Sequence, residues 1–402
     1  MNSRSLPAND PDIQTVDWTP TRSAGLKRLE QFVGRSGQAY ADTRNFDLGP
    51  ADRSNTTALS PWIRHRLITE VDVLSAVLAR HNPAECEKFV QEVFWRGYFK
   101  GWLEQRPSVW ASYLQDLDSA LQNPGSDYEC AISGRTGLDC FDAWAAELVE
   151  TGYLHNHARM WFASIWIFTL RLPWQLGADF FLQHLMDADP ASNTLSWRWV
   201  GGLHTKGKTY LARAENIARY TNGRFHPKGL AATAIPLTES VAHPLCPIPA
   251  SVAPPHGPFL LLLTLEDVGG AALMPHEPEA VVGLHGPVDS RSGRPQTDFA
   301  VGALGHALAK WRQDPVAVRD WAEPLLNKVE ATGVRRIVTP YAPIGPVRSA
   351  LDAAEPLLIR QGIEVIRVRR GYDSLVWPHA TRGFFGLKKQ IPQFLKDLHL
   401  TE

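Results

Sequence analysis

Residues 152–199 read GYLHNHARMWFASIWIFTLRLPWQLGADFFLQHLMDADPASNTLSWRW, and this stretch decides the fold. Its apolar residues, many of them aromatic, recur at helical spacing. Two polar groups, LHNHARM and DADPASN, stand among them. The pattern predicts a helix, a loop and a second helix, with an Asn, an Arg–Met pair, two Asp and a further Asn gathered around the loop.

The composition of the whole chain is that of a soluble globular protein. The 402 residues suffice for two or three domains, and 44% are hydrophobic and 21% charged. The net charge of −1 gives no reason to expect a polyanionic partner. Between residues 198 and 228, however, seven Lys and Arg stand against a single acid, Glu215. This run is either a solvated helix face or a rim that contacts phosphate groups.

The cysteines and the apolar runs bear on metals, membranes and location. The four Cys lack the CxxC or Cys/His spacing of metal sites, so we expect reduced thiols, no metal and no disulfide. We find no signal-peptide pattern at the start of the chain. The longest apolar strand-like run, residues 259–265, is too short to span a bilayer. These features predict a cytoplasmic protein with no membrane partner.

The residue pattern changes along the chain and predicts an α + α/β fold. Helical spacing predominates up to residue 224, including a helix near residues 26–40, and predicts an all-helical domain over residues 1–229. Six Pro mark residues 230–257 as a linker. Residues 258–402 then alternate strands with helices, which predicts a Rossmann-like α/β domain with a parallel sheet. The expected strands cover residues 259–265, 280–285, 335–339 and 364–369; the expected helices cover residues 299–313 and 346–361, with one more opening at Asp314 and Pro315.

Several motifs, taken in order, resemble the flavin-binding core of the photolyase/cryptochrome family. They are NTTALS (residues 55–60), FVQEVFWRGYF (89–99), LHNHARM (154–160) and DADPASN (187–193), and the likeness covers roughly residues 40–229. The resemblance implies a buried FAD that uses blue light to move an electron. An antenna pigment is not identified by the sequence.

The order of the two domains is unusual for this family, in which an α/β domain commonly precedes the helical one. The resemblance therefore implies a circular permutation. It rests, for the second domain, on TLEDVGGAAL (264–273) and WPHATRGFFGLKKQIPQFL (377–395). An unrelated Rossmann-like appendage is the alternative. A second dinucleotide site is not expected, because no G-x-G-x-x-G follows the first strand.

The cofactor residues are expected at a phosphate loop and around the flavin ring. Ser and Thr hydroxyls before a helix suit a phosphate, although a Thr-Thr pair can also be a simple helix cap. Asn193 would face the flavin N5, where an amide, a poorer proton donor than a carboxylic acid, suits an anionic reduced flavin. The resemblance assigns FAD contacts to Tyr40, Thr56, Thr57, Leu59, Ser60, Arg96, Arg159, Asp187, Asp189 and Asn193. Asp187 is expected to pair with Arg159.

The substrate residues are expected on the same helices. Glu92, Trp95 and Arg96 share one helix face, as do Asn156 and Met160. Without the resemblance, Glu92 and Arg96 would be interpreted as a surface ion pair of little energetic value. Family members that repair cyclobutane dimers carry Asn and Met at the positions of Asn156 and Met160. The resemblance assigns substrate or DNA contacts to Arg44, Glu92, Trp95, Asn156, Met160 and Trp199.

An electron-transfer chain is expected to lead from the surface to the flavin. Trp197 and Trp174 match two members of this chain. The third position falls on Leu121, where relatives carry Trp. Trp110, Trp144 or Tyr128 could complete a variant chain, and the sequence does not choose among them.

The function implied by the resemblance is light-driven, FAD-dependent repair of cyclobutane pyrimidine dimers in UV-damaged DNA. Such a protein is a carbon–carbon lyase, and Trp197, Trp174, Glu92 and Asn193 would take part in its chemistry. Two alternatives stay open. One is a cryptochrome-like blue-light photoreceptor that signals through an unidentified partner, and the other is a flavin-binding relative with neither activity.

Overall fold

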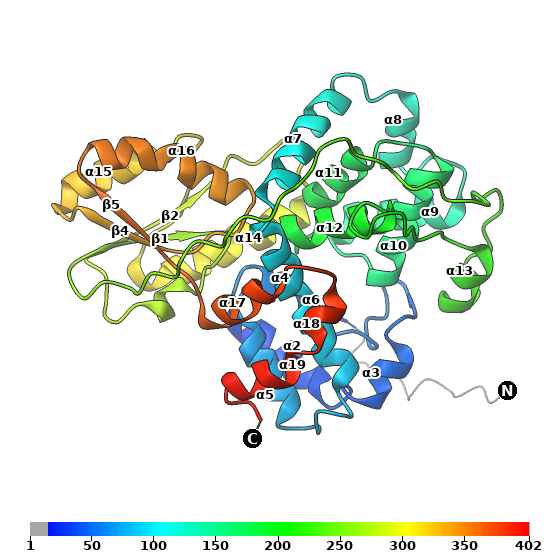
Figure 1. Cartoon of the computed structure of the whole chain (residues 1–402), viewed down its shortest axis with the longest axis horizontal. Coiled ribbons are helices and arrows are strands. Elements are labelled where there is room, and N and C mark those ends of the chain that lie inside the picture. The colour runs from blue at the N-terminus through cyan, green and yellow to red at the C-terminus, as the bar shows by residue number, and fades with distance from the viewer. Residues whose placement is uncertain (1–14, 402) are drawn as a thin grey trace.

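The computed structural model describes residues 15–401. A helical part comes first, a parallel sheet with flanking helices follows, and a last group of helices returns to the first part (Figure 1). This arrangement confirms the predicted α + α/β fold class. The first 14 residues of the helical domain predicted over residues 1–229 lie outside the described range.

The helical part contains no strand between residues 15 and 259. The helix expected near residues 26–40 is divided, because the first helix ends at Val33, with Gly34 as its C-cap, and the next begins at Gln38. The helices are α2 (Arg22–Val33), α3 (Gln38–Thr43), α4 (Ser60–Arg64), α5 (Glu70–Leu78), α6 (Glu87–Glu104), α7 (Pro107–Leu121), α8 (Ser126–Ile132), α9 (Asp139–Thr151), α10 (Asn156–Ser164) with a π-helical extension (Ile165–Thr169), α11 (Trp174–His184), α12 (Pro190–Val200) and α13 (Ala214–Tyr220).

The sheet has five parallel strands in the order β3-β2-β1-β4-β5. Alternate residues of the central strand point to opposite faces. Leu261 and Leu263 join the core that continues into the helical part, whereas Leu260 and Leu262 join a separate core under α15 and α16. The elements are β1 (Leu260–Thr264), β2 (Ala280–His285), α14 (Arg294–Leu308), β3 (Pro315–Ala317), α15 (Ala322–Thr332), β4 (Arg336–Pro340), α16 (Pro346–Arg360) and β5 (Glu364–Val368), with short 3-10 turns η2 (Gly270–Leu273) and η3 (Ala309–Trp311).

One expected element of the second part is wrong. Asp314 and Pro315 do not open a helix, because Pro315 begins strand β3 opposite Gly283 of β2. Pro lacks a backbone N–H and is tolerated in a sheet mainly at an edge, which is where β3 lies. The next helix, α15, begins seven residues later, at Ala322.

The last elements of the chain pack on α6, so segments far apart in the sequence lie side by side (Figure 1). They are α17 (Gly371–Val376), the 3-10 turn η4 (Trp377–His379), α18 (Phe384–Lys388) and α19 (Ile391–Asp397). Two glycines one turn apart on α6 permit this approach. A Cβ on Gly101 would lie 2.6 Å from the Trp377 Cα, and one on Gly97 would lie 3.0 Å from the Tyr372 hydroxyl.

Residues 230–257 form neither helix nor strand and run across the surface from the helical part to β1 (Figure 1). Backbone hydrogen bonds hold this linker at Leu237, which donates to the Gly201 carbonyl, and at Cys246, which donates to the Gln105 carbonyl. Among residues 15–401, no helix combines the length and the apolar character needed to cross a membrane.

Candidate functional site

Three helices carry most of the predicted site residues. Helix α12 packs against both α6 and α10, and thereby gathers the motifs that lie about 100 residues apart in sequence. Asp189 caps α12, because its Oδ1 accepts a hydrogen bond of 2.9 Å from the Ser192 backbone N–H. Pro190 at the first helical position is preorganised for this start.

Asp189 is surrounded by three cationic side chains. Its Oδ2 lies 3.3 Å from Arg96 Nη2, 3.4 Å from Lys100 Nζ and 3.9 Å from Arg64 Nε. Burial alone would raise the pKa of Asp189, but the charges of Lys100, Arg96 and Arg64 outweigh burial and hold this pKa well below its ordinary value. Asp189 is therefore a carboxylate over the whole physiological range. Lys100 and Arg64 had not been expected at the site.

Asp187 pairs with Arg159, as the sequence predicts. Arg159 Nη1 lies 3.2 Å and 3.1 Å from the two carboxylate oxygens. Arg159 Nε also donates to the Leu154 carbonyl, which fixes the guanidinium on α10. Burial raises the pKa of Asp187. The charges of Arg159 and Arg96, together with a hydrogen bond from Ser60, lower this pKa by more than burial raises it, so the pKa lies below its ordinary value. Ser60, at the start of α4, is thus joined to the loop before α12.

Arg28, which the motifs did not indicate, fixes the backbone of the predicted phosphate loop. Its guanidinium donates to the backbone carbonyls of Arg53, Thr56 and Thr57 at 3.0, 3.0 and 2.9 Å. Ala58 takes a positive φ of 53° in this turn. The loop is therefore a fixed backbone feature, with Leu59 buried beneath it.

Glu92 and Arg96 of α6 each pair with a residue outside this helix. Glu92 forms an ion pair with Arg44, and Arg96 forms one with Asp189. The alternative of a surface pair between Glu92 and Arg96 is therefore wrong. Tyr40 packs between the rings of Phe32 and Phe89, and burial raises its pKa.

The predicted substrate residues differ in accessibility. Asn156 is exposed, and Met160 and Trp199 are partly exposed, with Trp199 stacked on Tyr210 at 5.7 Å. Trp95, expected as a stacking wall, already carries the ring of Phe384 on one face, at 3.8 Å between centroids and 13° between planes. Motif comparison did not reveal this contact, because it joins residues nearly 300 positions apart.

The tryptophans expected to conduct electrons belong to two groups of aromatic rings, one around Trp197 and one around Trp174. Trp197 is buried and contacts Trp166 at 6.0 Å. Trp174 lies 5.5 Å from Tyr113, which lies 5.2 Å from Trp110. Of the three candidates for the missing position, Trp110 connects with Trp174 through Tyr113. Trp144 instead stacks on Trp161 at 5.5 Å, and Tyr128 lies 6.1 Å from Trp166.

Asn193 has a fixed amide. Its Nδ2 donates to the Ala178 carbonyl at 2.8 Å, and the side chain is buried between α11 and α12. The bond determines which end of the amide points away from α11. The residue lies on the first turn of α12, one turn beyond Asp189.

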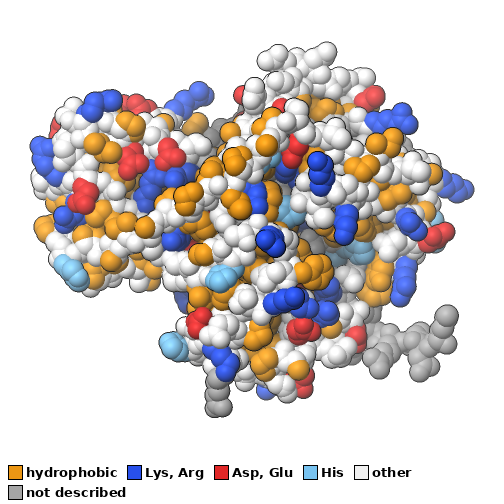
Figure 2. Space-filling model, viewed as in Figure 1, with side chains coloured by type: hydrophobic (Ala, Val, Ile, Leu, Met, Phe, Trp, Pro, Cys, Tyr) orange, Lys and Arg blue, Asp and Glu red, His pale blue; other side chains and the backbone are white. Residues whose placement is uncertain are grey.

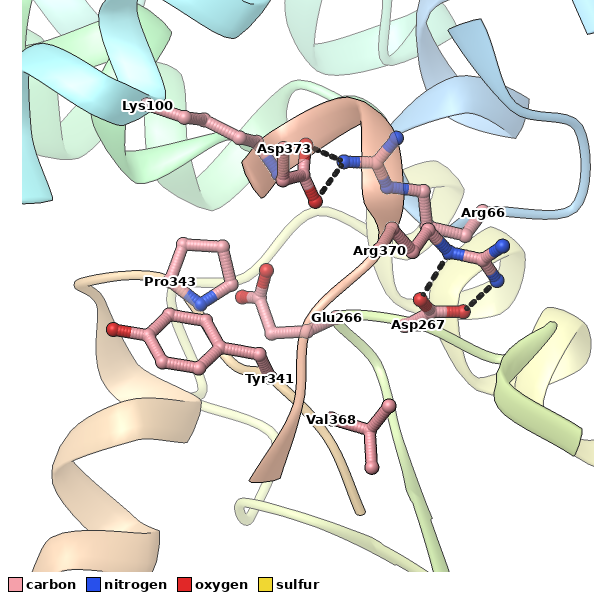
Figure 3. A pocket seen from close by; sticks show the side chains of 9 residues that line it. All are labelled: Arg66, Lys100, Glu266, Asp267, Tyr341, Pro343, Val368, Arg370 and Asp373. Carbon is pink, nitrogen blue, oxygen red and sulfur yellow. Dashed lines mark hydrogen bonds and ion pairs between the residues drawn. The ribbon is translucent and has the colours of Figure 1, made fainter. Parts of the chain in front are cut away.

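A small polar cavity separates this site from the sheet (Figure 3). It lies at the carboxyl ends of β1, β4 and β5, where the strand order reverses direction between β1 and β4. Arg370 pairs with Asp267 at 2.6 and 2.8 Å, and Arg66 pairs with Asp373 at 2.9 and 3.0 Å (Figure 3). The cavity is lined by Arg66, Lys100, Glu266, Asp267, Tyr341, Pro343, Val368, Arg370 and Asp373.

Glu266 connects the cavity wall with the cluster around Asp189. Its two carboxylate oxygens accept hydrogen bonds from Arg64 at 2.6 and 2.7 Å. Sequence reasoning had marked the segment TLEDVGGAAL but had given Glu266 no role. The contact brings the loop after β1 against the end of α4, directly behind the phosphate loop.

One buried polar atom in the predicted phosphate loop and one in the cluster around Asp189 bear on whether these residues fit a cofactor. Thr56 Oγ1 and Arg96 Nε have no hydrogen-bond partner among residues 15–401. An unpaired buried donor is costly, so each is expected to meet an acceptor in the functional protein. Phosphate and ribityl oxygens would be such acceptors, and these residues therefore fit FAD.

Comparisons with known proteins agree with this geometry. Residues 89–229 match the family model described as the FAD binding domain of DNA photolyase. The deoxyribodipyrimidine photo-lyase of Agrobacterium fabrum is 31% identical over 190 residues, which are 46% of this chain and 39% of that protein. The corresponding protein of Streptomyces griseus is 30% identical over 207 residues, covering 48% of this chain and 44% of its own length. The chain thus spans less than half the length of these relatives.

Solved structures give more distant matches. A bacterial class III photolyase from Agrobacterium tumefaciens is 26% identical, with a TM-score of 0.44, and the match covers 54% of this chain and 46% of that chain. The Synechocystis sp. cryptochrome is 22% identical, with a TM-score of 0.43, over 54% and 48% of the two chains. The helical part thus contains, over residues 89–229, a domain that matches the FAD binding domain of DNA photolyase. Its cofactor is FAD.

Proposed function

We propose that this protein repairs cyclobutane pyrimidine dimers in DNA with light absorbed by its flavin. The observation that carries the proposal is that α12 joins α10 and α6. Each of these three helices therefore carries a residue assigned to FAD (Arg96, Arg159 and Asn193) and a residue assigned to the dimer (Trp95, Met160 and Trp199). Met160 and Asn156 lie one turn apart beside Arg159, which holds the Asp187 loop.

Each part of the chain has a distinct task in this proposal. The FAD held by these residues would supply, when reduced and excited by light, the one-electron chemistry that splits both cyclobutane bonds. Arg159 and the cluster around Asp189 hold the loop before α12 in place. Asn193 presents a neutral amide, which is a poorer proton donor than a carboxylic acid. Asn156, Met160 and Trp199 offer accessible surface to a base turned out of the duplex, which costs less at a damaged site.

The electron path would serve to bring the flavin to its reduced state. An electron from an external reductant such as a thiol would pass inward through the contacting rings of Trp110, Tyr113 and Trp174 and then to Trp197. No group on this path needs to act as a general acid or base toward the dimer.

A cryptochrome-like photoreceptor is the second candidate, and the contact of Phe384 with Trp95 favours it. A protein that signals has no need of an open stacking face at Trp95, whereas a repair enzyme would have to use the other face of the ring or displace Phe384. The same FAD and the same aromatic path would serve this function, with a partner protein in place of DNA.

A blue-light repair assay on an oligonucleotide with one thymine dimer tests the proposal. Protein with reduced FAD should restore intact thymines under blue light and leave the dimer unchanged in the dark. Asn156→Ala should lower the yield and keep the flavin, because Asn156 is exposed and lies beside the proposed dimer site. Wild-type protein that is photoreduced but repairs nothing would reject repair in favour of the photoreceptor.

A further inference from the structure

Helix α18 presents an exposed aromatic ring in a basic setting. Phe385 is 78% exposed, whereas the neighbouring Phe384 is 4% exposed. One exposed Phe is ordinary on a protein surface. Its surroundings are not, because residues 377–396 contain four Lys or Arg and no acidic residue. Arg382 and Lys389, on either side of α18, are both exposed.

The helix is fixed in a way that keeps Phe385 pointing outward. Phe384 stacks on Trp95 at 3.8 Å and contacts the ring of Tyr98 at 5.6 Å. Arg106 Nη2 donates to the Thr381 carbonyl at 2.7 Å, just before α18. Because Phe384 and Leu387 supply the buried side of this short helix, the core has no place for Phe385.

A second basic segment, the loop of residues 202–208 that follows α12, contacts Tyr98 as well. The Tyr98 hydroxyl lies 2.9 Å from His204 Nε2, and His204 opens a loop that carries the exposed Lys206 and Lys208. Tyr98 therefore contacts Phe384 on one side and His204 on the other. The loop of residues 202–208 and α18 flank the same stretch of α6.

Three acidic groups of this region are paired with cations. Glu92 pairs with Arg44, Glu87 with Lys388 and Glu239 with Arg198. The exposed cations of the two segments therefore dominate the local field. Figure 2 shows Lys and Arg side chains, with hydrophobic side chains among them, around the place that α18 occupies in Figure 1.

We propose that α18 and the loop of residues 202–208 form one docking surface for DNA. Arg382, Lys389, Lys206 and Lys208 contact backbone phosphates, and Phe385 stacks on a base that has left its pair. The choice of DNA as partner rests on the proposed repair function; the location of the surface rests on the contacts of Phe384, Tyr98 and His204. Cations set the salt dependence of such binding, and an aromatic ring adds stacking that varies little with salt.

The test is the affinity of the full chain for fluorescent oligonucleotides, measured by anisotropy in the dark at several salt concentrations. Phe385→Ala should weaken binding to dimer-containing DNA at least about 5-fold, with little change in the salt slope. Lys206→Ala with Lys208→Ala should lower the salt slope by about 1 to 2, as expected for the loss of up to two phosphate contacts. Ile359→Ala and Arg360→Ala on α16, both at exposed positions, are the matched controls and should bind as wild type.

The outcomes separate this surface from the repair function. If wild-type protein repairs dimers while Phe385→Ala and the Lys variants bind DNA unchanged, the surface is overturned and repair stands. If these variants lose affinity as expected but wild-type protein repairs nothing, the surface stands and repair falls. Wild-type protein that does not bind DNA at all overturns both.

Discussion

Glu266 joins the sheet to the cofactor site, and Glu266→Gln removes the charge that makes this connection. Its carboxylate binds Arg64 through two hydrogen bonds of 2.6 and 2.7 Å, and the two side chains are only 3% and 6% exposed. Arg64 Nε in turn lies 3.9 Å from Asp189 and donates to the Ala188 carbonyl at 3.4 Å. A neutral Gln leaves Arg64 with Asp189 as its nearest remaining carboxylate in the cluster.

The expected cost follows from the burial of the pair. Removing one partner of a buried ion pair costs about 3–5 kcal/mol, because the remaining charge is uncompensated. Here Asp189 stays close and the Gln oxygen can still accept a hydrogen bond, so we expect the lower end, about 3 kcal/mol. Glu364→Gln is the matched control. Glu364 pairs with Arg336, and their side chains are 56% and 35% exposed. Ion pairs at the surface contribute about 0–1 kcal/mol to the free energy of unfolding.

Urea unfolding followed by Trp fluorescence gives the free energy of unfolding, and titration of apoprotein with FAD gives its affinity. Glu266→Gln should lower both, since Arg64 also holds the loop that carries Asp189. Glu364→Gln should leave the FAD affinity unchanged. Equal losses of stability in the two variants, or wild-type FAD affinity in Glu266→Gln, would refute the connection.

Three further predictions concern the aromatic path and the response to acid. Trp197→Phe should block or greatly slow the photoreduction of oxidised FAD by an external thiol while flavin stays bound, because Phe packs similarly but is harder to oxidise; unchanged bleaching under blue light would show that another route operates. Trp110→Phe should slow the same bleaching and Trp144→Phe should not, and equal rates in these two variants would exclude a path through Tyr113. Burial, aided by the charges of Arg198 and Arg106, lowers the pKa of His204 to about 4 from 6.5. The unfolded chain therefore gains this proton first, so the free energy of unfolding should fall from about pH 6.5 towards pH 4, and His204 should contribute roughly 1.4 kcal/mol per pH unit to this fall. His204→Gln should reduce the slope by that amount in urea unfolding at stepped pH; an identical slope would show that His204 is not the titrating group.

Sequence reasoning succeeded where periodicity or local spacing determines the structure. The 3–4 spacing of apolar residues predicts the helix observed as α6, and the largely apolar run at residues 259–265 contains the buried central strand β1. The pairing of Arg159 with Asp187 was implied by the family resemblance, and the structure shows it. The prediction from the sequence failed at Pro315. A Pro that follows an Asp is found both at the start of a helix and in an edge strand, so this local pattern does not distinguish the two.

Contacts across long separations could not be read from spacing. Arg64 and Glu266 are 202 residues apart, and Phe384 and Trp95 are 289 apart. Each depends on how the sheet and the last helices dock on α6. The sequence alone gives no role to Gly97 either. Its missing side chain makes room for Tyr372, and together with Gly101 it allows the chain after β5 to lie against α6.

The most direct test of the account is the visible absorption spectrum of the purified protein, with the flavin released and counted against protein. The cluster around Asp189, the phosphate loop held by Arg28 and the unpaired atoms of Thr56 and Arg96 together predict one non-covalent FAD per chain. We expect a yellow protein with the spectrum of oxidised flavin, and FAD released on denaturation. A colourless protein whose apo form does not take up added FAD would contradict the cofactor site and every function proposed from it.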